Sequence, residues 1–302
     1  MLERCQKFPV NMALAEKISI RRLTADLSSG CCWSWQAADC SGCLDELAVL
    51  LRLQKTAQRP AGQAADCELL SFRELGIVPP AAAAATEPAA IFCLRNGDHP
   101  WSPVLPDRAE LWRTLVLLAA HGLLLQGVGL ILHAAMIEFR GRAMVIAASS
   151  GTGKTTCARR IPVPWRAWCD DWTLLCRSGN GWRAHPLPTW SALKEGTVSG
   201  WPLETSFPLG AVYQLRRGSA DGSRRLRRIE LFSALYAGCH WQVLQGARLA
   251  GCGAAEMRSL TLRELGLIRS LVKNVPGFEL TATLDGHFWE FCRRDFGDWR
   301  LK

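Results

Sequence analysis

Ala148-Ser149-Ser150-Gly151-Thr152-Gly153-Lys154-Thr155 is the stretch of sequence that decides the fold of this chain. The apolar run Met144-Val145-Ile146-Ala147 precedes it and a helix-like segment follows it, so we expect a buried strand to enter the loop and a helix to leave it. Backbone N–H groups of a glycine-rich turn, the positive end of a helix, a lysine and a threonine hydroxyl together bind phosphate groups and Mg²⁺. The stretch therefore predicts a phosphate-binding loop.

This loop departs from the usual pattern G-x-x-x-x-G-K-[ST] at one position, because Ala148 stands where the first glycine is expected. A turn that resembles the pattern by accident is the alternative. Pro162 and Pro164 predict that the helix after the loop ends early, since proline cannot continue a helix.

Composition and charge exclude several classes of protein. The chain has 302 residues, of which 49% are hydrophobic and 21% charged, as in ordinary globular proteins. Residues 1–17 lack the uninterrupted apolar run of a secretory signal, and polar residues interrupt the longest apolar stretch, 115–137. We therefore expect a cytoplasmic protein without a membrane partner. No motif with interleaved aromatic residues predicts nucleic-acid binding, although the net charge of +9 suits an anionic ligand or an acidic partner.

The thirteen cysteines are scattered and odd in number, which favours reduced thiols over a disulfide framework. Cys40 and Cys43 form a C-x-x-C pair, with Cys31 and Cys32 nearby. A metal or redox site at this pair stays open as an alternative.

A segment bracketed by prolines, Pro79–Pro88, marks the boundary that we expect between domains. We expect residues 1–80 to form a small region of unknown role, residues 81–107 a linker or loop, and residues 108–302 the phosphate-loop domain. Helical spacing predicts a helix within the first region, near Leu44–Gln54.

Local patterns predict the elements around the loop. Residues 130–139 and 143–147 flank the turn Arg140-Gly141-Arg142 and predict a hairpin that leads into the loop. The other expected elements are a helix over 108–125, a strand through 167–175, and helices near 233–236 and 262–273.

Asp170 and Asp171 follow Lys154 by only 16 and 17 residues, at the end of an apolar segment. One carboxylate can hold Mg²⁺ while the other accepts a proton from an attacking hydroxyl, which are the two tasks that phosphoryl transfer requires. A solvated strand end is the alternative. His133 lies on the expected strand before the loop, and its two interpretations are a site residue and a buried neutral core histidine.

Six arginines flank the turn-forming segment 218–223, which predicts a solvated hairpin loop. The same cluster offers a binding site for an acidic peptide. These arginines are Arg216, Arg217, Arg224, Arg225, Arg227 and Arg228.

Together, the strand histidine His133, the loop 150–155 and the pair Asp170-Asp171 resemble the HPr kinase family. Within it they look most like HPr kinase-related proteins of cassettes that modify ribosomal peptides, of the SynChlorMet type. The segment Pro186–Ser191 adds to this similarity, which extends over about residues 108–290. The resemblance implies an α/β fold, namely an HPr kinase/PEP carboxykinase-like P-loop domain with a mixed twisted sheet, preceded by a smaller N-terminal α+β region.

The resemblance further implies a Mg-ATP-dependent kinase that phosphorylates a Ser or Thr hydroxyl of a peptide or protein. ATP and Mg²⁺ are then the cofactors, Asp170 the base, and Thr155 and Asp171 the metal ligands, with His133 and Lys154 also in the catalytic site. The family also suggests homo-oligomers. The residues expected to bind the nucleotide are Ser149, Ser150, Gly151, Thr152, Gly153, Lys154, Thr155 and Thr156.

Two other functions stay open. The same site would serve a kinase for a small hydroxyl metabolite. A nucleotide-binding accessory factor with little turnover fits the departures at Ala148 and Pro162. The glycine-rich signature of the bifunctional enzyme's phosphorylase activity is absent from the sequence, which makes HPr itself a doubtful substrate.

Overall fold

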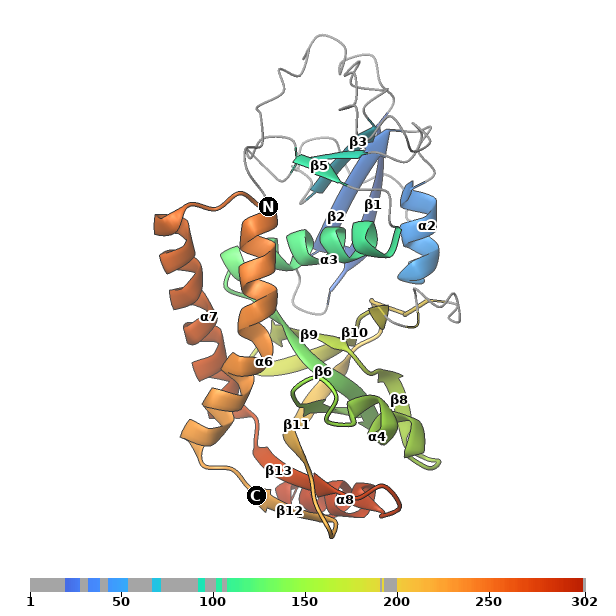
Figure 1. Ribbon diagram of the computed structural model, residues 1–302, viewed down its shortest axis with the longest axis vertical. Coiled ribbons are helices and arrows are strands. Elements are labelled where there is room, and N and C mark those ends of the chain that lie inside the picture. Colours follow the sequence, from blue (N-terminus) through green and yellow to red (C-terminus); the bar gives the residue numbers. More distant parts are fainter. Residues whose placement is uncertain are drawn as a thin grey trace.

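The computed structural model describes residues 20–27, 32–38, 43–53, 67–71, 92–95, 102–104, 108–190, 192 and 200–300. These residues form a mixed α/β protein with a smaller N-terminal sheet and a larger central sheet (Figure 1). Within these ranges, none of the helices combines the length and the apolar character that crossing a bilayer requires.

The N-terminal sheet has the order β1-β2-β3-β4-β5, with helix α2 (Cys43–Leu50) beside it where the sequence predicts a helix. Strands β4 and β5 fall within residues 81–107, where we expected a linker or loop. Strand β4 pairs antiparallel with both β3 and β5. Local composition does not encode such pairing between strands. The five strands are β1 (Ile20–Asp26), β2 (Cys32–Ala38), β3 (Cys67–Ser71), β4 (Phe92–Arg95) and β5 (Ser102–Val104).

The proline-bracketed segment 79–88 lies outside the described residues. So do Cys31 and Cys40, and the side chains of Cys32 and Cys43, so the metal or redox interpretation of the C-x-x-C pair is not addressed by the structure.

The central sheet has the order β10-β9-β6-β7-β11-β13-β12, and β8 pairs with β6. Strands β7, β11 and β13 run parallel to one another and the other pairs are antiparallel, so the expected mixed sheet is confirmed. Its strands are β6 (Gly129–Phe139), β7 (Arg142–Ala147), β8 (Arg166–Cys169), β9 (Trp172–Ser178), β10 (Gly181–Pro186), β11 (Phe207–Arg217), β12 (Gly222–Arg225) and β13 (Gly277–Ala282).

Helices cover both faces of this sheet (Figure 1). Successive side chains of β6 point to opposite faces: Ala134 and Met136 belong to one hydrophobic cluster, Ala135 and Ile137 to the other. Helices α3 (Arg108–Leu125), α6 (Arg228–Leu249) and α7 (Ala254–Asn274) contribute to the first cluster, and α4 (Lys154–Arg160) and α8 (Phe288–Arg300) to the second. Burial on both faces explains why β6 is apolar almost throughout.

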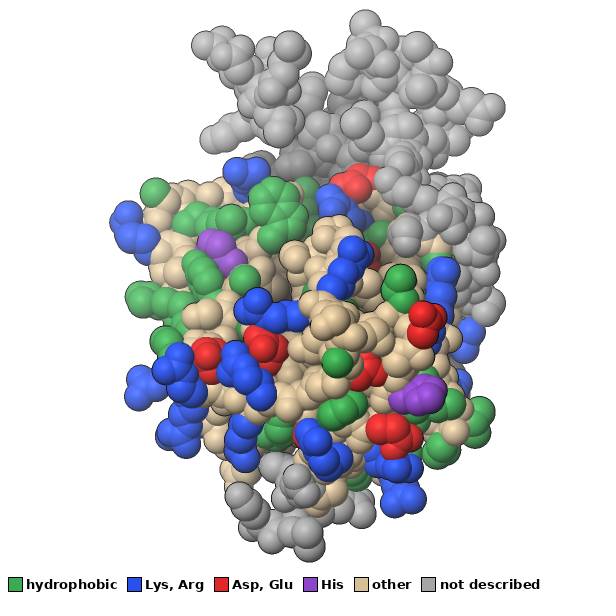
Figure 2. All heavy atoms as spheres, turned by 60° about the horizontal axis from the view of Figure 1, so that its bottom comes forward, with side chains coloured by type: hydrophobic (Ala, Val, Ile, Leu, Met, Phe, Trp, Pro, Cys, Tyr) green, Lys and Arg blue, Asp and Glu red, His purple; other side chains and the backbone are tan. Residues whose placement is uncertain are grey.

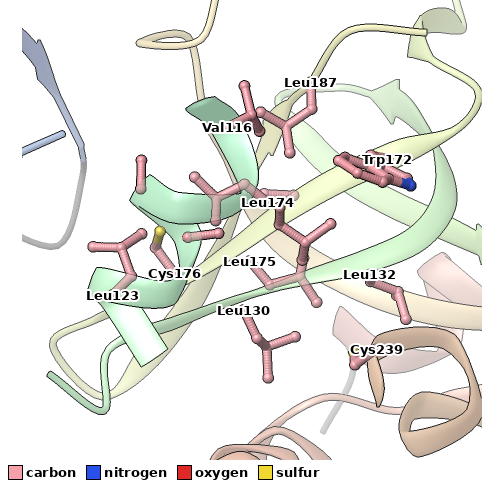
Figure 3. Packing of buried hydrophobic residues seen from close by; sticks show 14 of the residues in the cluster. Val116, Leu123, Leu130, Leu132, Trp172, Leu174, Leu175, Cys176, Leu187 and Cys239 are labelled. Atoms are coloured by element: carbon pink, nitrogen blue, oxygen red, sulfur yellow. The ribbon is translucent and has the colours of Figure 1, made fainter. Parts of the chain in front are cut away.

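Leucines dominate the first cluster (Figure 3). Leu123 of α3 and Leu174 of β9 are among the buried members, and Leu132 of β6 lies near Cys239 of α6. Burying such a side chain fully stabilises the fold by about 1.5–3 kcal/mol relative to leaving it exposed.

Hydrogen bonds join the N-terminal sheet and helix α2 to the larger part of the molecule. The indole Nε1 of Trp35 on β2 donates to the carbonyl oxygen of Leu115 on α3 at 3.4 Å. The backbone N–H of Asp26 donates to Glu204 at 3.0 Å, and the N–H of Trp201 donates to the carbonyl of Leu50 at 2.6 Å. Helix α3 lies between the two sheets (Figure 1) and packs on both.

The helix over 108–125 and the hairpin of β6 and β7 are confirmed, whereas two local expectations are wrong. The expected strand 167–175 is two strands, interrupted at Asp170 and Asp171. The arginine-rich strands β11 and β12 do not pair as a hairpin, because β13 inserts between them. The expected helices near 233–236 and 262–273 lie within α6 and α7, in the first half of α6 and over most of α7.

Candidate functional site

Residues 148–153 form a tight loop, here called the glycine loop, between β7 and α4. Gly151 and Gly153 have φ angles of 75° and 114°, which L side chains rarely adopt. A Cβ atom added to either glycine would meet no atom within 4 Å, so both glycines border open space. The N–H of Thr152 donates to the carbonyl of Ser149 at 3.3 Å and closes the turn.

Ala148 fits its position without strain. Among the described residues other than glycine, positive φ angles occur at Arg52 and Arg140, so the backbone of Ala148 lies in the ordinary range. Its methyl group packs against the second hydrophobic cluster. The conformation at this position therefore does not require glycine.

Helix α4 ends at Arg160, and Ile161 is already extended with a ψ angle of 132°. The early end that Pro162 predicts is confirmed. The helix still has its first residue, Lys154, buried beneath the glycine loop.

Lys154 is only 7% exposed, and its ammonium group turns back onto the loop. Its Nζ donates to the carbonyl oxygens of Ala148 at 2.9 Å and Ser149 at 3.3 Å. Burial lowers the pKa of Lys154, while the nearby carboxylates of Asp171 and Asp170 oppose this shift. The cation therefore lies in the field of both acidic residues.

The register of β6 explains how the two aspartates reach the glycine loop. On one edge of β6, Ala134 pairs with Ala147, the last residue of β7 before the loop. On the other edge, His133 pairs with Trp172 and Met136 with Cys169, so Asp170 and Asp171 lie opposite Ala134 and Ala135. A single strand thus separates the loop from the acidic pair.

His133 and Asp171 form the contact at the centre of this arrangement. The Nε2 atom of His133 lies 3.2 Å from Oδ1 of Asp171, and their side chains are 28% and 29% exposed. His133 therefore contacts an acidic side chain at a cavity wall and is not enclosed in the hydrophobic core.

Asp170 is held by a different partner, Thr189. The hydroxyl of Thr189 donates to Oδ1 of Asp170, and the backbone N–H of Asp170 points to the same hydroxyl at 3.4 Å. Thr189 reaches this place because the chain after β10 folds back: the N–H of Leu187 donates to the carbonyl of Trp172 at 3.3 Å. The segment 186–191 contributes to the family resemblance in the sequence, but no residue spacing predicts that Thr189 contacts Asp170.

Arg217 contacts the glycine loop from the end of β11. Its Nε donates to the carbonyl of Thr152 at 3.1 Å, and its Nη2 donates to the carbonyl of Gly151. These bonds occupy loop carbonyls and fix the loop against a neighbouring strand. The sequence placed this residue in a hairpin, so its contact with the loop was missed.

A cavity of about 700 Å³ opens beside the glycine loop. Its walls are His133, the end of β7 with residues 148–152, the end of β11 at 214–217, and Ala234, Ala237 and Gly238 of α6. Its size is within the range of about 300–1,000 Å³ that is common for ligand pockets. Lys154, Thr155, Asp170 and Asp171 are not among the residues that line this cavity, and Thr156 is exposed.

Thr155 and Asp171 are the residues that the sequence predicts as ligands of Mg²⁺. The described residues contain no group of three or more His, Cys, Asp or Glu side chains that could hold a metal ion. Mg²⁺ usually binds one or two carboxylates together with phosphates and water. Thr155 and Asp171 fit that limited donor set.

A family model described as SynChlorMet cassette protein ScmC matches residues 110–296, more than half of the chain. The chain belongs to the ScmC family. The match begins in α3 and ends in α8, so the ScmC region contains the central sheet, the glycine loop and the acidic pair. The predicted cassette type is thereby confirmed. A search of curated proteins finds no match.

Proposed function

We propose that this ScmC protein is a Mg-ATP-dependent phosphotransferase with an HPr kinase-like P-loop domain, acting on a Ser or Thr hydroxyl of a peptide or protein. One observation carries the proposal: Asp170 and Asp171 lie across the single strand β6 from the glycine loop, and His133 on that strand contacts Asp171. The field of both carboxylates at Lys154 supports it. The cavity beside the loop is large enough for a nucleotide.

Each residue then has a distinct task. Lys154 and the N–H groups of the glycine loop bind the terminal phosphates. Thr155 and Asp171 hold Mg²⁺, which neutralises phosphate charge, and His133 keeps one oxygen of Asp171 in place. Ser149, Ser150 and Thr156 border the phosphate positions in this assignment.

Asp170 is the proposed general base. Thr189 occupies its Oδ1 atom, which leaves Oδ2 for the acceptor hydroxyl. As the acceptor oxygen bonds to the γ-phosphorus and the bond from that phosphorus to ADP breaks, Asp170 takes the hydroxyl proton. Positioning supplies most of the rate, because phosphoryl transfer asks for little covalent chemistry from the protein.

The test is to incubate the purified protein with Mg-ATP and the peptide encoded beside its gene, and to measure the peptide's intact mass. We expect a gain of one phosphoryl group that requires Mg²⁺. ATP binding without transfer to that peptide or to other peptide and protein hydroxyls would contradict the proposal. That result would favour the accessory-factor alternative.

A further inference from the structure

A second cavity, of about 350 Å³, lies between the start of α6, the end of α7 and the start of β13. Its wall carries Arg225, Arg227, Arg228 and Lys273, and we call it the basic pocket. Figure 2 shows Lys and Arg side chains gathered on this side of the molecule, where α6 begins and α7 ends.

The basic pocket is separate from the glycine-loop cavity. Arg217 touches the loop at the end of β11, whereas Gly277 of the basic pocket pairs with Val212, five residues earlier on the same strand. At a rise of about 3.3 Å per residue, the two places are roughly 16 Å apart along the sheet.

Half of the arginine cluster forms ion pairs within the protein. Arg216 and Arg224 bind Glu279 at 2.6 and 3.1 Å, and Arg227 binds Glu230 at 3.4 Å. The N–H of Arg227 donates to Glu230 at 2.7 Å, and this bond is the main reason that the pKa of Glu230 is lowered to about 2. Glu230 is therefore charged and already engaged.

The remaining cations have no such partner. Arg225, Arg228 and Lys273 come from three different elements, are exposed, and form no ion pair with any residue that the structure describes. The first turn of α6 adds the positive end of a 22-residue helix to the same place. The pocket therefore keeps an uncompensated positive charge.

The floor of the pocket decides what kind of anion it suits. The carbonyls of Pro276 and Gly277 already accept from Val212 and Leu226, and the N–H of Val275 donates to Leu271. A Cβ on Gly277 would come within 2.5 Å of Leu231, so the floor is tightly packed. These floor groups offer an anion no backbone N–H donor, so recognition rests on the first turn of α6 and on the exposed side chains at the rim.

We propose that the basic pocket docks an acidic segment of a peptide or protein partner. Several carboxylates on one partner chain bind Arg225, Arg228 and Lys273 together. Once the first carboxylate is bound, the remaining ion pairs form within the complex, so the partner does not lose translational freedom a second time. Guanidinium groups also pair with carboxylates through two parallel hydrogen bonds. This inference is independent of phosphoryl transfer, because binding requires no nucleotide.

The test measures fluorescence anisotropy of a labelled Asp-Gly-Asp-Gly-Asp-Gly-Asp peptide with the full chain in the absence of nucleotide. Arg225→Glu/Arg228→Glu should weaken binding at least about tenfold. The matched control is Arg248→Glu/Arg258→Glu, which makes the same change in net charge at exposed residues of α6 and α7 away from the pocket. This control should weaken binding less than about twofold.

Equal weakening by the two double variants would overturn the proposal, since it would reflect net charge alone. Pyrophosphate binding that is tighter than peptide binding and is lost in Arg225→Glu/Arg228→Glu would also overturn it, because the loss would assign a small-oxyanion site to the basic pocket and not to the glycine loop. An Asn-Gly peptide of equal length should not bind. Arg225→Gln/Arg228→Gln should give an intermediate loss and provides the test if the charge-reversed chain does not fold, which its thermal unfolding curve will show.

Discussion

The glycine-loop site and the basic pocket both collect charged side chains, but they differ in how those charges are compensated. Lys154, Asp170 and Asp171 each bind a partner within the protein, and Lys154 is buried. Arg225, Arg228 and Lys273 are exposed and form no ion pair with a residue that the structure describes. The first arrangement is fixed before a ligand arrives, whereas the second acts through charge and is screened by salt. Substitutions should therefore have large effects at the first site and small, salt-dependent ones at the second.

The largest expected effect comes from Lys154→Met, which keeps the length of the side chain and removes its charge. Loss of charge-assisted bonds to phosphate should weaken ATP binding at least about 100-fold, or about 2.7 kcal/mol. Lys273→Met makes the same change in the basic pocket and should alter ATP affinity less than about twofold. Isothermal titration calorimetry measures both; equal effects would remove the distinction between the two regions.

A smaller effect is expected from acid, through His185, which precedes the segment that carries Thr189 to Asp170. His185 is fully buried, its Nδ1 donates to the carbonyl of Leu203 at 2.8 Å, and burial lowers its pKa to about 4. Below its unfolded pKa of about 6.5, the unfolded chain binds a proton that the folded chain does not bind until about pH 4. The free energy of unfolding should therefore fall by about 2 kcal/mol between pH 8 and pH 5 on account of this residue.

His185→Gln checks this expectation, because its amide can donate to the same carbonyl without titrating. Urea unfolding at pH 8 and pH 5 should show a smaller loss of stability for the variant than for the wild type. The same loss in both proteins would show that other groups cause the acid sensitivity. Binding of the acidic peptide at pH 8 should be the same in both proteins, because His185 does not line the basic pocket.

Local signals in the sequence were sufficient to predict the glycine loop and the elements beside it. The apolar run before Ala148 predicted β7, and Pro162 predicted the early end of α4. Long-range pairing was not accessible in this way. The interruption at Asp170 and Asp171 depends on β6 pairing with two successive strands, and the insertion of β13 depends on a segment about 60 residues away from β11.

The residues that complete the site were missed for the same reason. Thr189 contacts Asp170 from 19 residues away, and Arg217 contacts the glycine loop from 65 residues away. Neither contact follows a periodicity that a single sequence displays. His133 was ambiguous in sequence because an apolar strand surrounds it, and only the register of β6 places it beside Asp171.

The measurement that tests the central claim most directly compares Asp170→Asn with the wild type in two assays, ATP affinity and the rate of phosphoryl transfer to the peptide encoded beside the gene. If the glycine loop binds phosphate and Asp170 removes the acceptor proton, the rate should fall at least about 100-fold while the affinity changes less than about threefold. An equal loss of affinity and rate, or an unchanged rate, would contradict the assignment of Asp170 as the base beside a separate phosphate-binding loop.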